Sequence, residues 1–135
     1  MTGIADTGFI VAFVNRDDQH HNWAAALARH ITEPLLTCEA VLAEAAFKLY
    51  STSIVIELLR SDFLRISFDL EENITHIGQL AEKYEDRNPD LADLCLIRMS
   101  EIYPTRDVLT VDADFRVYRR NKREPIPIVC PPRRA

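Results

Sequence analysis

Short apolar segments alternate with helix-like segments along the whole chain, and this alternation limits the fold more than any other feature. The segments that read as strands are 3–6, 34–38, 64–68, 107–112 and 125–130. The segments with helical periodicity are 7–15, 20–31, 38–50, 53–61, 70–86 and 90–102. Because parallel strands need crossover connections, the alternation predicts a three-layer α/β/α sandwich with a mainly parallel central sheet of four to five strands.

Composition supports one such unit. The chain has 135 residues, of which 47% are hydrophobic, so we expect a single domain over residues 1–135 with a sizeable core. Charges interrupt the apolar runs, and the N-terminus lacks a basic region followed by an apolar stretch. We therefore expect a cytoplasmic protein without a membrane span. The three cysteines are Cys38, Cys95 and Cys130; their apolar surroundings favour small buried side chains in a reducing compartment.

Turn and cap residues suggest where the helices begin. We expect Thr7 to cap the helix over 7–15 and Thr37 to lead into the helix over 38–50. Pro89 suits the first turn of the helix that contains 90–102.

Several carboxylates stand in apolar settings where burial is costly. The helix over 90–102 is apolar nearly all round, yet it carries Asp90 and Asp93 on one face. Glu44 is the only acid in AVLAEAAF, and Asp6 is the only charge before Arg16. Asp90 can cap its own helix, but caps explain neither Glu44 nor Asp93. A buried carboxylate needs a basic partner, a metal ion or a water-filled cleft.

Two acids also mark the ends of predicted strands. Asp6 and Asp112 both follow strands, and the working site of an open parallel sheet lies outside the carboxyl ends of its strands. Asp112 and Asp114 could also cap a helix that starts near Phe115. If acids from two strands and two helices converge, their repulsion calls for a cation. Oxygen ligands favour Mg²⁺ or Mn²⁺, which predicts hydrolysis of phosphoesters by metal-activated water.

Four motifs, in this order, resemble the PIN domain family and, within it, the VapC-type toxin ribonucleases. The motifs are IADTGFIVAF, TCEAVLAEAAF, PDLADLCLIRMSE and VLTVDADFRVYR, and together they span nearly the entire chain. The resemblance implies that the catalytic, metal-binding acids are Asp6, Glu44, Asp93 and Asp112. Asp90 and Asp114 match acids present in part of the family. Thr7 and Thr110 match hydroxyls that border the site, and Phe115 matches an aromatic behind it.

The resemblance also implies an activity and partners. The activity would be metal-dependent endoribonuclease cleavage, with the protein acting as the toxin of a toxin–antitoxin pair. The partners would be RNA, an antitoxin whose tail covers the acidic cleft, and a second copy in a homodimer. Arg116 and Arg119 are candidates for holding RNA phosphates, whereas the net charge of −5 disfavours indiscriminate RNA binding. Ile54, Ile56, Leu58, Leu59 and Phe63 of SIVIELLRSDFL are candidates for burial, mostly in the core.

Other protein classes fit less well. A receiver domain would need neighbouring acids after its first strand and a late lysine, and a haloacid-dehalogenase-type phosphatase would need D-x-D on its first strand. No G-x-S-x-G elbow or glycine-rich phosphate loop is present. Nothing pairs the four histidines (His20, His21, His30 and His76) with a nucleophile. The main alternative is a catalytically silent PIN-like module that binds RNA or a protein partner.

Overall fold

A five-stranded parallel sheet forms the centre of the protein. The computed structural model describes residues 1–132. The strands are β1 (Gly3–Ala5), β2 (Leu35–Thr37), β3 (Leu64–Ile66), β4 (Asp107–Leu109) and β7 (Ile128–Val129). Their order is β3-β2-β1-β4-β7, and every neighbouring pair is parallel. The predicted mainly parallel sheet is confirmed.

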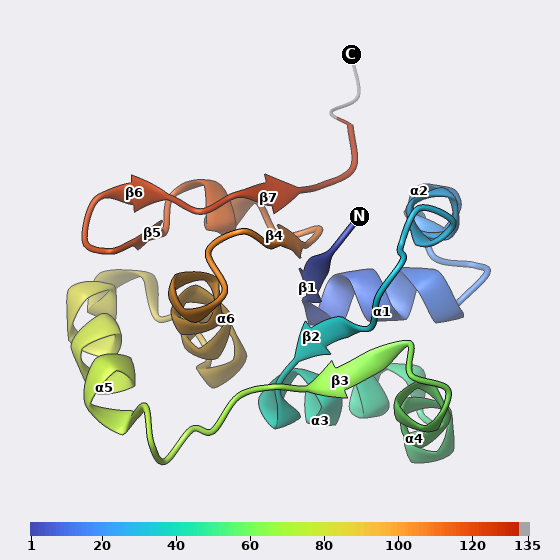
Figure 1. The fold of residues 1–135 in the computed structure, drawn as a ribbon, viewed down its shortest axis with the longest axis horizontal. Coiled ribbons are helices and arrows are strands. Elements are labelled where there is room, and N and C mark those ends of the chain that lie inside the picture. The colour runs from blue at the N-terminus through green and yellow to red at the C-terminus, as the bar shows by residue number, and fades with distance from the viewer. Residues whose placement is uncertain (133–135) are drawn as a thin grey trace.

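Helices connect the strands and flank the sheet. They are α1 (Thr7–Val14), α2 (His21–Ala28), α3 (Glu39–Leu49), α4 (Thr52–Arg60), α5 (Ile74–Lys83) and α6 (Leu91–Ile102). Two short 3-10 helices follow α5 and β4: η1 (Glu85–Arg87) and η2 (Ala113–Arg116). In Figure 1, α5 and α6 lie to the left of the sheet and α1 and α2 to its right. The predicted α/β/α sandwich is therefore confirmed. Among residues 1–132, no helix is long and apolar enough to cross a membrane.

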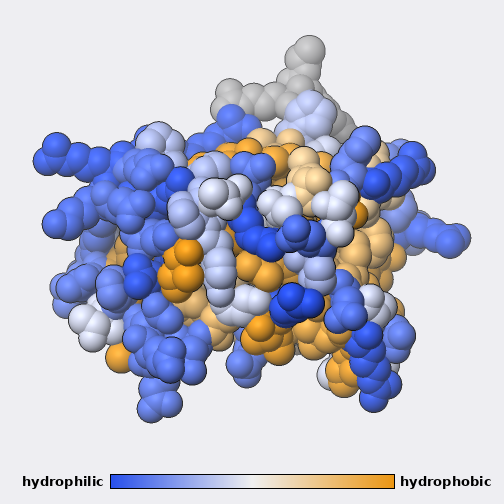
Figure 2. Space-filling model, in the orientation of Figure 1, coloured by the Kyte–Doolittle hydropathy of each residue, from blue (hydrophilic) through white to orange (hydrophobic). Residues whose placement is uncertain are grey.

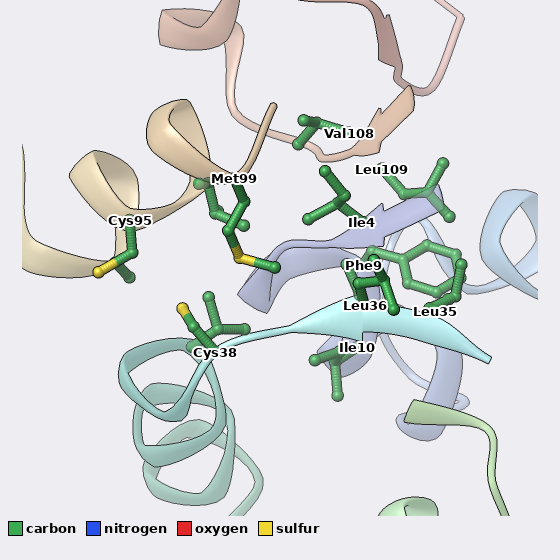
Figure 3. Packing of buried hydrophobic residues seen from close by; sticks show 14 of the residues in the cluster. Ile4, Phe9, Ile10, Leu35, Leu36, Cys38, Cys95, Met99, Val108 and Leu109 are labelled. Atoms are coloured by element: carbon green, nitrogen blue, oxygen red, sulfur yellow. The ribbon is translucent and has the colours of Figure 1, made fainter. Parts of the chain in front are cut away.

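The core is built around the central strand. Ile4 of β1 pairs with Leu36 of β2 and with Val108 of β4, and Ile4 and Val108 are fully buried. Figure 3 shows these side chains beside Phe9 of α1 and Met99 of α6. Full burial of each large apolar side chain stabilises the fold by about 1.5–3 kcal/mol. Packing by α1 and α6 thus stabilises the edge of the sheet at the carboxyl ends of β1 and β4.

The surface is hydrophilic at its margins. Figure 2 shows blue side chains at the left and right of this face, with apolar patches between them. Leu58, Leu59 and Phe63 pack partly buried against the core, as expected. Ile54 and Ile56 remain 39% and 42% exposed on α4.

The predicted N-cap of α1 was wrong, although the helix begins at Thr7 as expected. Asp6, not Thr7, is the N-cap residue, and its Oδ1 accepts a 2.6 Å hydrogen bond from the Thr7 N–H. Asp6 has the extended backbone of a cap, whereas Thr7 already lies in the helix. One carboxylate thus both caps α1 and points to the carboxyl edge of the sheet.

The roles predicted for Thr37 and Pro89 at the starts of α3 and α6 were also wrong. Cys38 is the N-cap residue of α3, because the hydroxyl of Thr37 instead donates to the Ala5 carbonyl at 3.1 Å across the sheet. Pro89 lies outside α6, whose N-cap is Asp90, so the capping role foreseen for Asp90 is confirmed. In both cases a tertiary or capping hydrogen bond moves the start of the helix.

Two further segments differ from the sequence-based expectation. The helix predicted from residue 70 begins at Ile74, because residues 70–73 form a turn in which the Asn73 N–H donates to the Leu70 carbonyl. A small antiparallel hairpin, β5 (Arg119–Arg120) with β6 (Glu124–Pro125), precedes β7 and was not predicted.

Candidate metal centre

The site begins where β1 and β4 end side by side. Ala5 pairs with Leu109, and the Asp6 N–H extends the pairing by donating to the Leu109 carbonyl at 3.1 Å. Asp6 therefore leaves β1 directly beside Thr110, and Asp112 follows two residues later. This confirms that Asp6 and Asp112 share the carboxyl edge of the parallel sheet.

Asp6 is a buried carboxylate with two local donors. It is only 6% exposed, and its Oδ2 accepts a 2.6 Å hydrogen bond from the Thr110 hydroxyl. Burial raises the pKa of Asp6 to about 6, although the hydrogen bonds from Thr110 and Thr7 oppose that rise. The negative charges of Asp112 and Glu44 raise it further. The pKa of Asp6 therefore depends on the charges of two other predicted site acids.

Thr110 organises the turn after β4. Its buried oxygen donates to Asp6 and accepts a 2.9 Å hydrogen bond from the Asp112 N–H. Asp112 then caps η2, since its Oδ1 accepts from the Asp114 N–H at 2.9 Å. The capping role foreseen for Asp112 is confirmed, but the helix that it caps is a short 3-10 turn.

Asp93 enters the site from the first turn of α6. It forms a capping box with Asp90: the Asp93 N–H donates to Asp90 Oδ1 at 2.8 Å, and the Asp90 N–H donates to Asp93 Oδ2 at 3.3 Å. The expectation that capping does not explain Asp93 was therefore wrong. Burial raises the pKa of Asp93 to about 7, and the charges of Asp90, Asp6 and Asp112 add to the rise.

Glu44 lies at the margin of the site. Its Oε2 accepts a 3.4 Å hydrogen bond from the Thr7 hydroxyl, and its Oε1 lies 3.7 Å from Lys48 Nζ. The side chain of Glu44 is 34% exposed, so its ion pair with Lys48 is weak. Thr7, the residue that follows Asp6, therefore links Glu44 to the start of α1.

The outer rim carries the remaining predicted residues. Asp114 is exposed and lies 3.8 Å from Arg87 of η1, which the sequence did not single out. Arg119 Nη1 donates to three backbone carbonyls, those of residues 116, 117 and 118, so this guanidinium fastens η2 to the hairpin. Arg116 is exposed and donates to Cys130 Sγ at 2.9 Å.

An aromatic wall closes the site from behind. Phe115 is fully buried, and its ring meets that of Tyr118 edge-to-face at 5.3 Å. Burial raises the pKa of Tyr118, and the charges of Asp93, Asp114 and Asp112 raise it further, so Tyr118 lies within electrostatic range of these acids. Sequence reasoning missed Tyr118, although its three-residue spacing from Phe115 in a predicted helical turn was a usable signal.

The donor set suits a hard divalent cation. Among residues 1–132, Asp6, Asp93 and Asp112 form no ion pair with a lysine, arginine or histidine. These carboxylates therefore repel one another without a protein cation, and oxygen donors match Mg²⁺ or Mn²⁺. However, the described residues contain no group of three or more His, Cys, Asp or Glu side chains arranged to hold a metal ion.

Comparisons with known proteins agree with this architecture. Residues 4–121 match the family model described as PIN domain. The crystal structure of Mycobacterium tuberculosis VapC20, described as a Sarcin-Ricin loop cleaving toxin, superposes with a TM-score of 0.70 at 19% sequence identity. The similarity covers 84% of this chain and 92% of that chain. No curated protein matches the sequence. Because the family model spans most of the sequence, the chain belongs to the PIN domain family.

Proposed function

We propose that this chain is a metal-dependent endoribonuclease, the toxin of a toxin–antitoxin pair that acts in the cytoplasm. The observation that carries the proposal is the shared edge of the sheet at which Asp6 and Asp112 follow β1 and β4, with Asp93 close enough to respond to their charges. Burial raises the pKa of both Asp6 and Asp93, and the charge of Asp112 raises both further. Membership of the PIN domain family supports it, as does the likeness in fold to a toxin described as cleaving the Sarcin-Ricin loop.

In this proposal four carboxylates, Asp6, Glu44, Asp93 and Asp112, hold Mg²⁺ or Mn²⁺. A bound ion would supply Lewis-acid stabilisation of phosphate charge and would lower the pKa of a bound water. Asp90 and Asp114 are further candidates because the Asp90 carboxylate accepts from the Asp93 N–H, and the Asp114 N–H donates to the Asp112 carboxylate. The protein itself contributes by ordering these carboxylates before the substrate binds.

The hydroxyls prepare the acids for this role. The Thr110 hydroxyl fixes the Asp6 carboxylate and the start of the turn that carries Asp112. The Thr7 hydroxyl directs Glu44 toward the same edge of the sheet. Supporting hydrogen bonds of this kind restrict the orientation of ligating carboxylates and raise their affinity for metal.

RNA would bind at the outer rim of the site. Arg116 is exposed on η2 and is the better candidate for a phosphate contact, because Arg119 Nη1 is engaged by three carbonyls. Arg87, beside Asp114, adds a second positive charge. With a net charge of −5, we expect weak binding of arbitrary RNA and a strong dependence on salt.

An antitoxin and a second copy of the chain are the proposed protein partners. Phe47 and Tyr50 at the end of α3 are 78% and 95% exposed, beside a groove of about 610 Å³ between α3 and α4. Exposed aromatic side chains next to an apolar groove are typical of interaction surfaces. Sedimentation of a monomer at high micromolar concentration would contradict the homodimer.

One observation favours a second candidate, a catalytically silent module. The site acids within residues 1–132 are not grouped as a metal site; Asp6 and Asp112 serve as N-caps, and Asp93 completes the capping box of Asp90. In that case the chain would bind RNA or a protein without cutting. Cleavage that depends on a divalent ion separates the two candidates.

The test is an analysis of the ends of cleaved RNA. Purified protein is incubated with structured RNAs and Mg²⁺ or Mn²⁺, and the products are identified by mass spectrometry. Hydrolysis that displaces the 3′ oxygen leaves a 5′-phosphate and a 3′-hydroxyl, whereas attack by the 2′-hydroxyl leaves a cyclic phosphate. We expect 5′-phosphates, abolished by EDTA and by Asp6→Asn but retained in Asp86→Asn, an exposed control. Cyclic phosphates, or cutting that survives EDTA, would refute the mechanism, and no cutting would favour the silent module.

A further inference from the structure

Two cysteines on neighbouring helices line one pocket beside the acidic site. Cys38 is the N-cap residue of α3, and Cys95 lies in the second turn of α6. They are 2% and 1% exposed. Figure 3 shows both side chains in the space between α6 and the start of α3, with the Cys38 sulfur directed toward α6. The tertiary fold therefore brings together two thiols that are far apart in the sequence.

The same two side chains line a pocket. It has a volume of about 340 Å³, and its other lining residues are Glu39, Ala40, Phe68, Leu70 and Leu91. The lining is mainly apolar, with Glu39 exposed. A small uncharged molecule can therefore reach the thiols through this pocket, although both cysteines are buried.

Cys38 has the surroundings of a reactive thiol. The thiol of Cys95 lowers the pKa of Cys38 despite the opposing effect of burial, and the backbone N–H groups of Val41 and Ala40 lower it further. Amide groups at the start of a helix stabilise a thiolate, which is the nucleophilic form. Cys130 offers a contrast, because it is half-buried and accepts from Arg116 outside this pocket.

We propose that Cys38 and Cys95 are a site of covalent modification, a thiol pair that hydrogen peroxide converts into a disulfide joining the start of α3 to α6. The Cys38 thiolate attacks one oxygen of the peroxide; an S–O bond forms, the O–O bond breaks and hydroxide leaves. Cys95 then attacks the sulfenic sulfur; the S–S bond forms, the S–O bond breaks and a second hydroxide leaves. The two thiol protons convert both hydroxides to water, so peroxide is reduced and the thiols are oxidised.

A disulfide between Cys38 and Cys95 would restrain the two helices that carry Glu44 and Asp93. A disulfide requires a sulfur–sulfur distance of about 2.05 Å, so α3 and α6 become fixed relative to each other. Glu44 lies on α3 and Asp93 on α6, two residues before Cys95. The modification does not depend on the proposed nuclease activity, because it is a property of the thiols and of the pocket.

The experiment uses the full chain in a Cys130→Ser background, which leaves only the pair. The protein is treated with hydrogen peroxide, alkylated under denaturing conditions, digested without reductant and analysed by mass spectrometry. We expect the alkylatable thiols of Cys38 and Cys95 to be lost together. We also expect one peptide that links the two residues, restored to two peptides by a thiol reductant. Wild type should give the same linked peptide.

Two variants assign the order of attack. In Cys95→Ala, a diketone probe for sulfenic acid should label Cys38, because no second thiol is present to resolve it. In Cys38→Ala, the same probe should leave Cys95 unlabelled. Oxidation of the two cysteines without a linked peptide, or only links between separate chains, would overturn the proposal. Labelling of Cys95 in Cys38→Ala would overturn the assignment of Cys38 as the nucleophile.

Discussion

The hydroxyl of Thr110 donates a 2.6 Å hydrogen bond to Oδ2 of Asp6, joining the residue that follows β1 to the residue that follows β4. Thr110 is fully buried and Asp6 is 6% exposed, so water competes little for this bond. The same hydroxyl oxygen accepts from the Asp112 N–H. One side chain therefore sets the relative positions of two of the proposed metal ligands.

Replacing Thr110 by valine keeps the shape of the side chain but removes this hydroxyl. We expect Thr110→Val to lower the free energy of unfolding by about 1–3 kcal/mol, because the Asp6 carboxylate and the Asp112 N–H lose a partner. It should also weaken Mn²⁺ binding, measured by calorimetry. Thr37→Val is the matched control, since the buried Thr37 hydroxyl donates to the Ala5 carbonyl. That control should lose stability but keep its Mn²⁺ affinity; equal affinity in both variants would contradict the role of Thr110.

Gly8 allows α1 to approach the turn after β4. A Cβ at this position would clash with Cγ2 of Val111, the residue between Thr110 and Asp112. We expect Gly8→Ala to destabilise the protein by about 1–3 kcal/mol despite its better helix propensity, because Val111 must move. Denaturant unfolding measures the loss. The Cβ of residue 111 itself would lie 3.5 Å away, so Gly8→Ala with Val111→Ala should recover much of it. If the double variant recovers no stability, the loss in Gly8→Ala does not arise from the contact with Val111.

The sequence carried enough information for the sheet and for the convergence of the strand-end acids. Asp6 and Asp112 directly follow apolar strands, and parallel pairing places the carboxyl ends of β1 and β4 together. The helix starts were harder to predict because Asp6 and Thr7 are both good cap residues. The choice between them depends on a tertiary contact, the hydrogen bond from Thr110.

Contacts between distant elements were beyond sequence reasoning for a physical reason. The approach of Cys38 to Cys95 depends on how α3 packs on α6, and no local pattern encodes that distance. Asp93 shows a related limit. The spacing of Asp90 and Asp93 was visible, but an Asp at the third helical position was not read as half of a capping box, a role more usual for Glu or Gln.

The metal-free protein should become less stable as the pH rises through the acidic and neutral range. The folded pKa of Asp6 is about 6 and that of Asp93 about 7, both raised from 3.8. The folded state therefore binds more protons than the unfolded state above pH 3.8, and the resulting stabilisation is lost as the pH passes the folded pKa values. In EDTA, from about pH 5 to about pH 8, Asp6 alone should remove on the order of 1 kcal/mol.

Chemical unfolding at a series of pH values measures this slope. Asp93→Asn should flatten it, because the amide does not titrate. Asp86→Asn removes one exposed charge of η1 and should leave the slope unchanged. A wild-type stability that rises over the same pH range would show that the site acids are not raised in pKa.

The metal should reverse the rank order of wild type and Asp93→Asn. Without metal at neutral pH, Asp93→Asn should unfold no more readily than wild type, because the amide removes repulsion with Asp90, Asp6 and Asp112, while its oxygen can still accept from the Asp90 N–H. At a Mn²⁺ concentration of about 100 times Kd, wild type should gain about 2.7 kcal/mol, since the ion binds only the folded state. Asp93→Asn, having lost a ligand, should gain much less. Thermal melts with and without Mn²⁺, with Asp86→Asn as the control that follows wild type, measure both quantities. A large loss of metal-free stability in Asp93→Asn would assign this carboxylate to the capping box instead of to the ion.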